Sequence, residues 1–265
     1  MCELFGMSAR RPMAVNGFLE LLGPRGGGTG PHADGWGIAW YDGRAAEIYK
    51  QPEPAAHSRC FSLLADLPRM SGLVIAHLRR ANPPEFGRGR ANTHPFDREM
   101  GGRTWVFAHN GKLAGIHADP RFATSRFLPV GDTDSEAAFC YLLERLADQA
   151  PAAPGHISSG HLEATLRDAV EELSALGELN FLLADGFHLI AYATGRLHLL
   201  ERPCSAKGCD DAVVFLATEP LTAEAWAPLA PRTIHVFATG RRSVLAKHGP
   251  SSPGPGVHVY ASLVL

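Results

Sequence analysis

The chain has 265 residues, of which 45% are hydrophobic and 20% are charged, as is usual for a globular protein that can bury a sizeable core. Its 25 lysines and arginines nearly balance its 27 aspartates and glutamates, so the net charge of −2 gives no reason to expect nucleic acid or an anionic membrane as a partner. No apolar run approaches the ~18 residues of a membrane span, and Glu3 interrupts the apolar start where a signal peptide would need continuity. We therefore expect a cytoplasmic protein.

Five cysteines stand at positions 2, 60, 140, 204 and 209, an odd number that is widely scattered. This pattern argues against a disulfide framework. Cys204 and Cys209 are followed by Asp210 and Asp211, but no second ligand pair with zinc-like spacing lies near them. We therefore expect no metal site and no cofactor.

The first half of the chain is predicted to be mostly strands joined by short helices and loops. Apolar runs bounded by turn residues predict strands at Cys2–Met7, Gly35–Tyr41, Glu47–Gln51, Gly72–Arg79 and Thr104–Ala108. Helical spacing of apolar residues predicts helices at Val15–Leu22 and His57–Leu67. A glycine-rich loop at 26–30 and a long polar loop at 82–93 interrupt these elements.

The second half begins with two consecutive amphipathic helices, Asp134–Ala150 and His161–Leu176, the latter closed by Gly177 as a cap. Strands are then predicted at Leu179–Ala184, His188–Ala193, Leu197–Leu200, Ala212–Thr218, Thr233–Ala238, Val244–Lys247 and Val257–Val264. The short connections favour antiparallel pairing. Strands, then two helices, then strands indicate an α+β fold rather than alternating βαβ units.

Cys2 is the first residue with chemical potential. If Met1 were removed, its thiol and its α-amine would stand on one carbon, which is a nucleophile and a base in a single residue. The alternative is a small buried thiol in an N-terminal strand. Glycines around Trp36, preceded by Asp34, would allow another group to approach the backbone closely, although such glycines also occur in plain linkers.

Two further strand ends carry polar groups. Arg79 leaves a predicted buried strand, where its guanidinium could bind a carboxylate with two parallel hydrogen bonds, or could simply be solvated. His109, Asn110 and Gly111 follow another strand. A side-chain amide beside a glycine N–H is the composition of an oxyanion hole, and Asn-Gly is also the commonest hairpin turn. The acidic stretch around Asp134 could cap a helix, through Asp132 or Thr133.

Together and in this order, these motifs resemble the type 2 (class II) glutamine amidotransferases, which are N-terminal-nucleophile hydrolases. The resemblance is carried by the following motifs: Cys2, Asp34–Gly37, His77-x-Arg79, Thr93-His94, His109-Asn110-Gly111 and Thr133-Asp134-Ser135-Glu136. The opening residues 1–9 and the block 25–37 are most similar to the stand-alone bacterial members, so we expect one domain over residues 1–265.

The resemblance implies a four-layer α/β/β/α sandwich of two stacked antiparallel sheets. It also implies a role for each site residue: Cys2 as nucleophile, Asn110 and Gly111 as the oxyanion hole, Arg79 on the α-carboxylate of glutamine, Asp134 on its α-ammonium, and Thr93 and His94 lining the pocket. The implied reaction gives glutamate and ammonia, with an ammonia-accepting partner protein as one destination. A homo-oligomer stays open.

The sequence departs from the commonest family pattern between Arg79 and Thr93. Many relatives have a short Arg-Trp-Ala-Thr-His segment, whereas here an insertion, Asn82–Asn92, separates the two, and Arg80 replaces the tryptophan. The resemblance therefore does not extend to Arg80 or to an ammonia channel. Two other functions stay open: hydrolysis of a γ-glutamyl conjugate or another small amide, and a non-catalytic binding module with the same fold.

Overall fold

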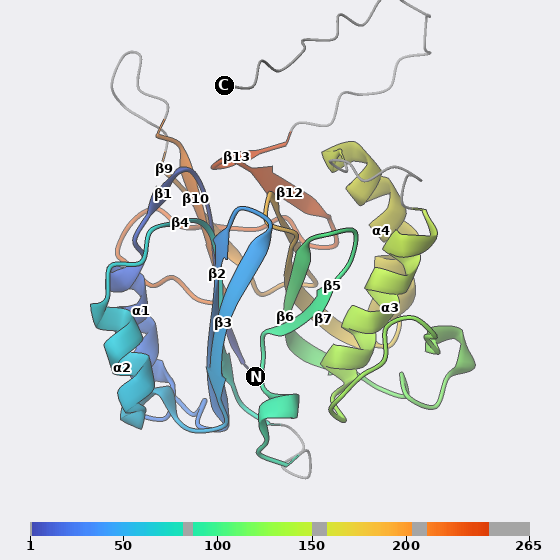
Figure 1. The fold of residues 1–265 in the computed structure, drawn as a ribbon, viewed down its shortest axis with the longest axis horizontal. Coiled ribbons are helices and arrows are strands. Elements are labelled where there is room, and N and C mark those ends of the chain that lie inside the picture. The colour runs from blue at the N-terminus through green and yellow to red at the C-terminus, as the bar shows by residue number, and fades with distance from the viewer. Residues whose placement is uncertain (1, 82–86, 150–157, 203–210, 244–265) are drawn as a thin grey trace, which may run out of the picture.

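The computed structural model describes residues 2–81, 87–149, 158–202 and 211–243. Its strands form two antiparallel sheets that stack face to face, with a pair of helices on the outer face of each sheet (Figure 1). The structure thus confirms the α+β fold and the α/β/β/α layer order expected from the sequence. Strands that are distant in sequence are neighbours in both sheets, so the fold can bring separated motifs together.

The first sheet has the order β11-β9-β10-β1-β4-β2-β3, which places the N-terminal strand β1 at its centre. Helices α1 (Asn16–Leu22) and α2 (Arg59–Asp66) cover its outer face. The strands are β1 (Glu3–Met13), β2 (Gly35–Asp42), β3 (Ala45–Gln51), β4 (Ser71–Arg79), β9 (His198–Arg202), β10 (Val213–Ala217) and β11 (Ala227–Pro228).

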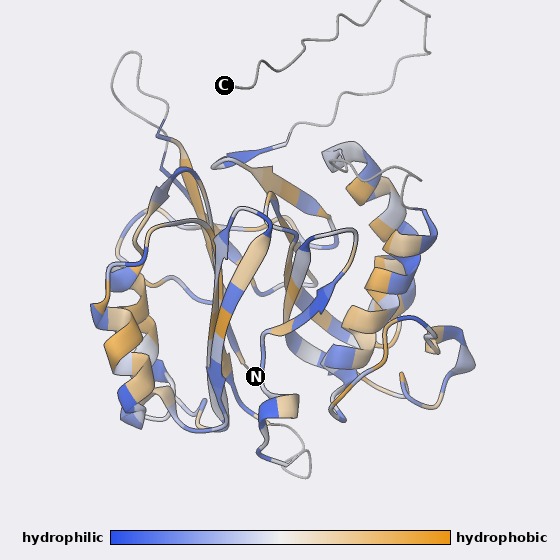
Figure 2. Ribbon diagram, viewed as in Figure 1, coloured by the Kyte–Doolittle hydropathy of each residue, from blue (hydrophilic) through white to orange (hydrophobic). Residues whose placement is uncertain are grey.

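The second sheet has the order β13-β12-β8-β7-β6-β5. Helices α3 (Asp134–Asp148) and α4 (Ser159–Ser174) cover its outer face, and both carry polar residues on the side away from the sheet (Figure 2). The strands are β5 (Phe96–Glu99), β6 (Thr104–Leu113), β7 (Gly177–Ala184), β8 (His188–Ala193), β12 (His235–Ala238) and β13 (Arg241–Arg242).

Central strands are apolar on both faces because each face meets a different core layer. In β6, Trp105 and Phe107 pack under α3 and α4, whereas Val106 and Ala108 point to the layer between the sheets. Successive side chains of a strand point to opposite faces, so these strands have continuous apolar sequences rather than alternating ones. This explains why the sequence predicted most of them.

The largest difference from the sequence prediction concerns the end of β6. We predicted that this strand stops at Ala108, with a hairpin turn as one interpretation of the Asn-Gly pair that follows, but it continues to Leu113. Asn110 and Gly111 pair with Asn180 and Leu179 of β7, so they are strand residues and not a hairpin turn. The partner strand lies about 70 residues away in sequence, and local turn preference could not reveal it.

Smaller differences occur at other ends. Helix α4 ends at Ser174 with Ala175 as its cap, and Gly177 starts β7 instead of closing the helix, so that prediction was wrong. The short strand β5 was not predicted, because its four residues carry no apolar pattern. The strands predicted at Val244–Lys247 and Val257–Val264 lie outside the described residues.

Candidate active site

Cys2 lies directly before β1, in the sheet centre, where β4 ends beside it. The register pairs Glu3 with Leu78, so the antiparallel β4 brings Arg79 and Arg80 alongside Cys2. The Arg80 N–H donates to Cys2 Sγ at 3.3 Å, and the Cys2 thiol is 3.5 Å from the Arg80 carbonyl oxygen. The thiol is therefore held between the two backbone groups of one residue.

Asn110 reaches Cys2 from the other sheet. The Cys2 N–H donates to Asn110 Oδ1 at 2.9 Å, a contact between residues 108 positions apart. This donor orients the amide with its oxygen toward Cys2, so Nδ2 points elsewhere. Asn110 Nδ2 is fully buried and has no hydrogen-bond partner in the described structure. The side chain that contacts Cys2 thus has an unused donor.

Gly111 follows Asn110 on the same strand, where only glycine fits. A Cβ atom at this position would lie 1.9 Å from the carbonyl oxygen of Glu178 on β7. Asn180, also on β7, donates from Nδ2 to the Asn110 carbonyl oxygen at 2.9 Å and accepts from the N–H groups of Thr194 and Arg196. Strand β7 therefore fixes the backbone of the Asn110-Gly111 pair.

Asp34 fixes the turn that follows Arg79. Its Oδ2 accepts from the Ala81 N–H at 2.9 Å, and its Oδ1 accepts from Arg88 at 3.1 Å. Its own N–H donates to the Arg79 carbonyl at 3.0 Å. Arg79 is 3% exposed. Burial lowers the pKa of its guanidinium, and the negative charge of Asp34 opposes this shift. Asp34 thus shapes the turn whose backbone contacts Cys2.

Asp134 is the first residue of α3, and both of its oxygens are bound by backbone. Oδ2 accepts from the Leu113 N–H at 2.7 Å, and Oδ1 accepts from the Ser135 N–H at 2.8 Å. Thr133 is the N-cap, as one of the two expected residues, and its side chain accepts from the Glu136 N–H. The Asp134 carboxylate is half-buried at the end of β6, close enough to influence the charge of Cys2.

Thr93 and His94 lie behind this group. The Thr93 hydroxyl donates to the Gly89 carbonyl at 2.8 Å, and its methyl group faces Gly35, which pairs with Arg79. The His94 ring is 3% exposed and lies against His77 and Phe96, with ring centroids 4.1 and 4.4 Å apart. Among the described contacts, neither side chain bonds to Cys2 or Asn110.

The surroundings of the Cys2 thiol favour its protonated form. Burial raises its pKa above the ordinary value, while the Arg80 N–H and the charge of Arg79 lower it and the charge of Asp134 raises it. The net direction is upward, so the neutral thiol is the resting form at neutral pH. A nucleophile in this state needs a base that removes its proton during attack.

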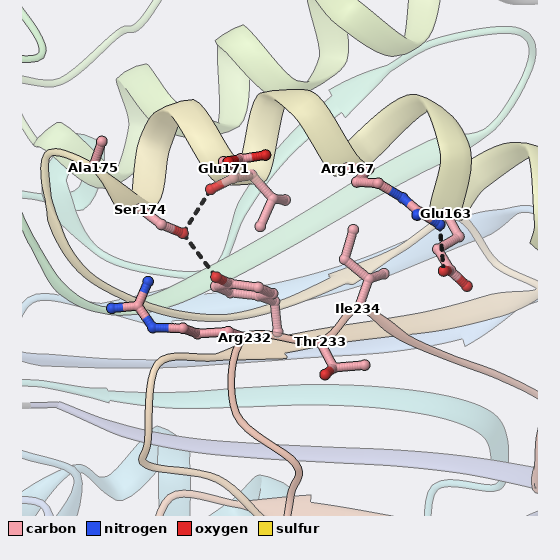
Figure 3. Close-up of a pocket in the computed structure, with 10 residues that line it drawn as sticks. Glu163, Arg167, Glu171, Ser174, Ala175, Arg232, Thr233 and Ile234 are labelled. Carbon is pink, nitrogen blue, oxygen red and sulfur yellow. Dashed lines mark hydrogen bonds and ion pairs between the residues drawn. The ribbon is translucent and has the colours of Figure 1, made fainter.

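Other features of the molecule lie apart from this group. A surface hollow of about 580 Å³ lies between α4 and the segment before β12, and Figure 3 shows Ser174 and Arg232 on its two sides. None of the seven predicted site residues lines it. Within the described ranges, no cluster of His, Cys, Asp and Glu could hold a metal, and no helix is long and apolar enough to span a membrane. Cys204 and Cys209 lie outside those ranges.

Comparison with known proteins identifies the family to which this pattern of motifs belongs. The family model of class-II glutamine amidotransferases matches residues 1–255. The chain belongs to this family. It is 39% identical over 262 residues to the Escherichia coli K12 protein named "Putative glutamine amidotransferase YafJ". The match covers 92% of this chain and 100% of the E. coli protein.

Solved structures of amidotransferases have the same fold. The "predicted glutamine amidotransferase" of Pseudomonas aeruginosa PA01 has 36% identity and a TM-score of 0.67, covering 93% of this chain and all of that one. The glutamine phosphoribosylpyrophosphate amidotransferase of B. subtilis, at 17% identity, has a TM-score of 0.64 and matches over 48% of its own length, which is a likeness of fold.

The geometry of this amidotransferase adds residues that the sequence did not identify as part of the site. These are the backbone of Arg80, Asp34, Asn180, and the pair His109 and Ser135, whose side chains are 2.9 Å apart. Asp34, His109 and Ser135 stood inside the recognised motifs, so their sequence positions were a signal. Asn180 lay in an apolar strand, where a single buried amide was the only clue.

Proposed function

We propose that this amidotransferase hydrolyses the side-chain amide of glutamine, with Cys2 as nucleophile after removal of Met1. The observation that carries the proposal is a contact between the two sheets. Asn110 Oδ1 accepts a hydrogen bond from the Cys2 nitrogen, and the buried Nδ2 of the same amide is left as an unpartnered donor. A donor held in this way suits an oxygen that becomes negatively charged during attack.

The freed α-amine of Cys2 acts as the base. Its ordinary pKa of about 7.7–8.0 lies near neutral pH, so it accepts the thiol proton as Sγ attacks the amide carbon. The oxyanion binds Asn110 Nδ2 and the Gly111 N–H. The amine then returns the proton to the leaving nitrogen, the C–N bond breaks, and ammonia departs from a thioester on Cys2. Water, deprotonated by the same amine, attacks the thioester, and glutamate and the thiol are released.

The remaining site residues hold the amino-acid end of glutamine. Arg79 binds the α-carboxylate, and its charge is close enough to lower the pKa of Cys2. Asp134 binds the α-ammonium, because its oxygens already face backbone donors and keep lone pairs for a cation. Thr93 and His94 support this pocket from behind, through Gly35 and His77.

A γ-glutamyl conjugate is the second candidate substrate. Cys2 is partly buried and the neighbouring Arg80 is exposed, so a leaving group larger than ammonia could extend toward Arg80. The clamp on the glutamyl end would serve both substrates, which differ only in the amine. Comparing kcat/KM for glutamine with that for a γ-glutamyl anilide decides between them.

The test of the proposed nucleophile is intact mass spectrometry before and after reaction with the diazo ketone analogue of L-glutamine. We expect the processed protein to lack one methionine and to gain one label, located on Cys2 by peptide mapping. Cys60→Ser should label normally, since Cys60 lies on α2, which covers the outer face of the first sheet, and makes no contact with Cys2 among the described bonds. Labelling of Cys60 instead, or no labelling of processed protein, would contradict the proposal and favour a binding module.

The fate of ammonia distinguishes a free hydrolase from a partner-coupled one. If the enzyme acts alone, glutamate and ammonia should appear in equal amounts. If a partner protein accepts ammonia, hydrolysis should be slow alone and should rise when that partner and its own substrate are added. Coupled assays for both products on the same sample measure this ratio.

A further inference from the structure

The two ends of a bound glutamine would be held by different secondary-structure elements. The amide end meets Asn110 on β6, and the ammonium end meets Asp134 at the start of α3. The separation of these two residues must match the length of the substrate. Some contact must therefore hold the first turn of α3 at a fixed position against β6. The inference that follows rests on the function proposed above.

A side-chain contact joins the neighbours of both residues. His109 precedes Asn110, and Ser135 follows Asp134. His109 Nδ1 lies 2.9 Å from Ser135 Oγ, and the two residues are 1% and 5% exposed. The contact thus lies one residue from the oxyanion donor on one side and one residue from the carboxylate on the other, in a layer from which water is excluded.

The direction of this hydrogen bond follows from the other side of the ring. His109 Nε2 is 3.2 Å from the Glu178 carbonyl oxygen, which can only accept, so Nε2 carries the hydrogen. Burial lowers the pKa of His109, and the charge of Asp134 opposes this only in part, so the ring is neutral. Nδ1 is then an acceptor, and the Ser135 hydroxyl must donate to it.

The hydroxyl has one hydrogen, and it has two possible acceptors. Asp134 Oδ1 is 3.4 Å from Ser135 Oγ, whereas His109 Nδ1 is 2.9 Å away. The shorter contact takes the hydrogen. Asp134 Oδ1 is held instead by the Ser135 N–H, so the position of Ser135 determines the position of that oxygen.

We infer that His109 and Ser135 are positioning residues, whose hydroxyl–imidazole bond sets the distance between the oxyanion donor and the ammonium-binding carboxylate. Neither touches substrate. His109 acts on Asn110 through the β6 backbone and through Glu178, whose carbonyl also faces Gly111. Ser135 acts on Asp134 through its own N–H. The direct bond from the Leu113 N–H to Asp134 Oδ2 is a second link between the same two elements.

Ser135→Ala removes the hydroxyl while keeping the helix start. We expect it to raise KM for glutamine about 5- to 10-fold, the loss typical of one buried hydrogen bond, with kcat changed less than about twofold. Ser135→Thr keeps a hydroxyl and should restore most of the affinity. Ser174→Ala, which removes a hydroxyl bonded to Tyr192 at the C-terminal end of α4, is the matched control and should change neither constant (Figure 3).

A substrate without the α-amine separates positioning from general damage. Glutaramate has the same amide and carbon chain, but it cannot use Asp134. The Ser135→Ala variant should therefore lose affinity for glutamine and keep the wild-type kcat/KM for glutaramate. Equal losses on both substrates, or a loss in kcat alone, would overturn the inference.

Nitrogen-15 NMR of the histidine rings tests the contact without any substrate. Wild-type His109 should be the neutral Nε2–H tautomer at pH 7, and its Nδ1 signal should shift in Ser135→Ala but not in Ser174→Ala. An Nδ1–H tautomer, or an unchanged signal, would disprove the hydrogen bond. If the wild type did not hydrolyse glutamine, the proposed function would fail while this measurement still decided whether the contact exists.

Discussion

At the scale of single residues, Asn110 combines two tasks in one amide. Its oxygen binds the Cys2 nitrogen, and its Nδ2 is buried without a partner in the described structure. Leaving a buried donor unsatisfied costs about 1–3 kcal/mol. An unpartnered donor on a side chain that contacts Cys2 can bind a ligand atom, which fits the proposed oxyanion hole.

Replacing Asn110 with alanine should affect turnover more than binding. Because the Nδ2 donor would act only on the developing oxyanion, we expect kcat to fall about 10²–10³-fold with little change in KM. The isosteric Asn110→Asp should be at least as damaging, since it places a negative charge where one develops. Steady-state kinetics with glutamine measure both constants, and an unchanged kcat in Asn110→Ala would rule out the oxyanion assignment.

Arg79 should show the opposite kinetic pattern. Its guanidinium is proposed to bind the substrate carboxylate in ground state and transition state alike, so Arg79→Ala should raise KM for glutamine with a smaller effect on kcat. Arg79→Lys should recover only part of the affinity, because lysine lacks the planar fork. Arg11→Ala, whose side chain is 75% exposed at the other end of β1, serves as the control. A KM unaffected in Arg79→Ala would contradict the role.

At the scale of elements, the pairing of β6 with β7 places the Asn110-Gly111 segment. Our prediction that the strand ends at Ala108 followed local preference, and the observed continuation follows from a partner distant in sequence. Helix α3 is different: its start at Asp134 was predicted correctly, because the capping residues and the apolar spacing are local signals. Local signals thus located the helix that carries Asp134 but not the strand environment of Asn110.

Gly111→Ala tests the close approach of these strands. The added Cβ would meet the Glu178 carbonyl at 1.9 Å, so either β7 shifts or the variant is destabilised, and we expect activity to fall together with the melting temperature. Gly17→Ala is the control, because its Cβ would meet nothing within 4 Å and it lies exposed in α1. That change should stabilise the protein by about 0.5–1 kcal/mol. The melting temperatures of both variants test these predictions. A Gly111→Ala variant with wild-type stability and activity would contradict the packing argument.

At the scale of the whole molecule, three histidines lie buried near the site, His77 and His94 stacked on each other and His109 against Ser135 of α3. His77 stacks on His94, and its Nε2 donates to the His109 carbonyl at 3.2 Å. Burial lowers the pKa of His77 to about 3, with the His109 carbonyl opposing the shift, and burial also lowers the pKa of His94 and of His109. All three are therefore neutral at pH 7.

These histidines should make stability depend on pH below neutrality. Their folded pKa values lie below the unfolded value of about 6.5, so between these values the unfolded chain binds more protons. The free energy of unfolding should therefore fall as the pH drops below 6.5, by up to about 1.4 kcal/mol per pH unit for each histidine.

Denaturant unfolding at pH 7, 6 and 5 measures this slope. His94→Phe should make it shallower by the share of one histidine, because phenylalanine occupies a similar volume between His77 and Phe96 without a titrating group. Carboxylates with lowered pKa values, such as Asp185, lose their contribution only at more acidic pH and do not disturb this window. An identical slope in wild type and His94→Phe would contradict the prediction.

The sequence by itself determined the elements and the chemical inventory. Apolar runs and caps are local, so they predicted most strands, the four helices and the α+β class, and the order of motifs predicted the family. Tertiary structure alone decided which groups meet. Cys2 and Asn110 touch because two sheets stack, Asn110 and Gly111 are strand residues because β7 pairs with them, and His109 reaches Ser135 because α3 packs on β6. These contacts join residues between 26 and 108 positions apart, and local sequence patterns carry no information at that range.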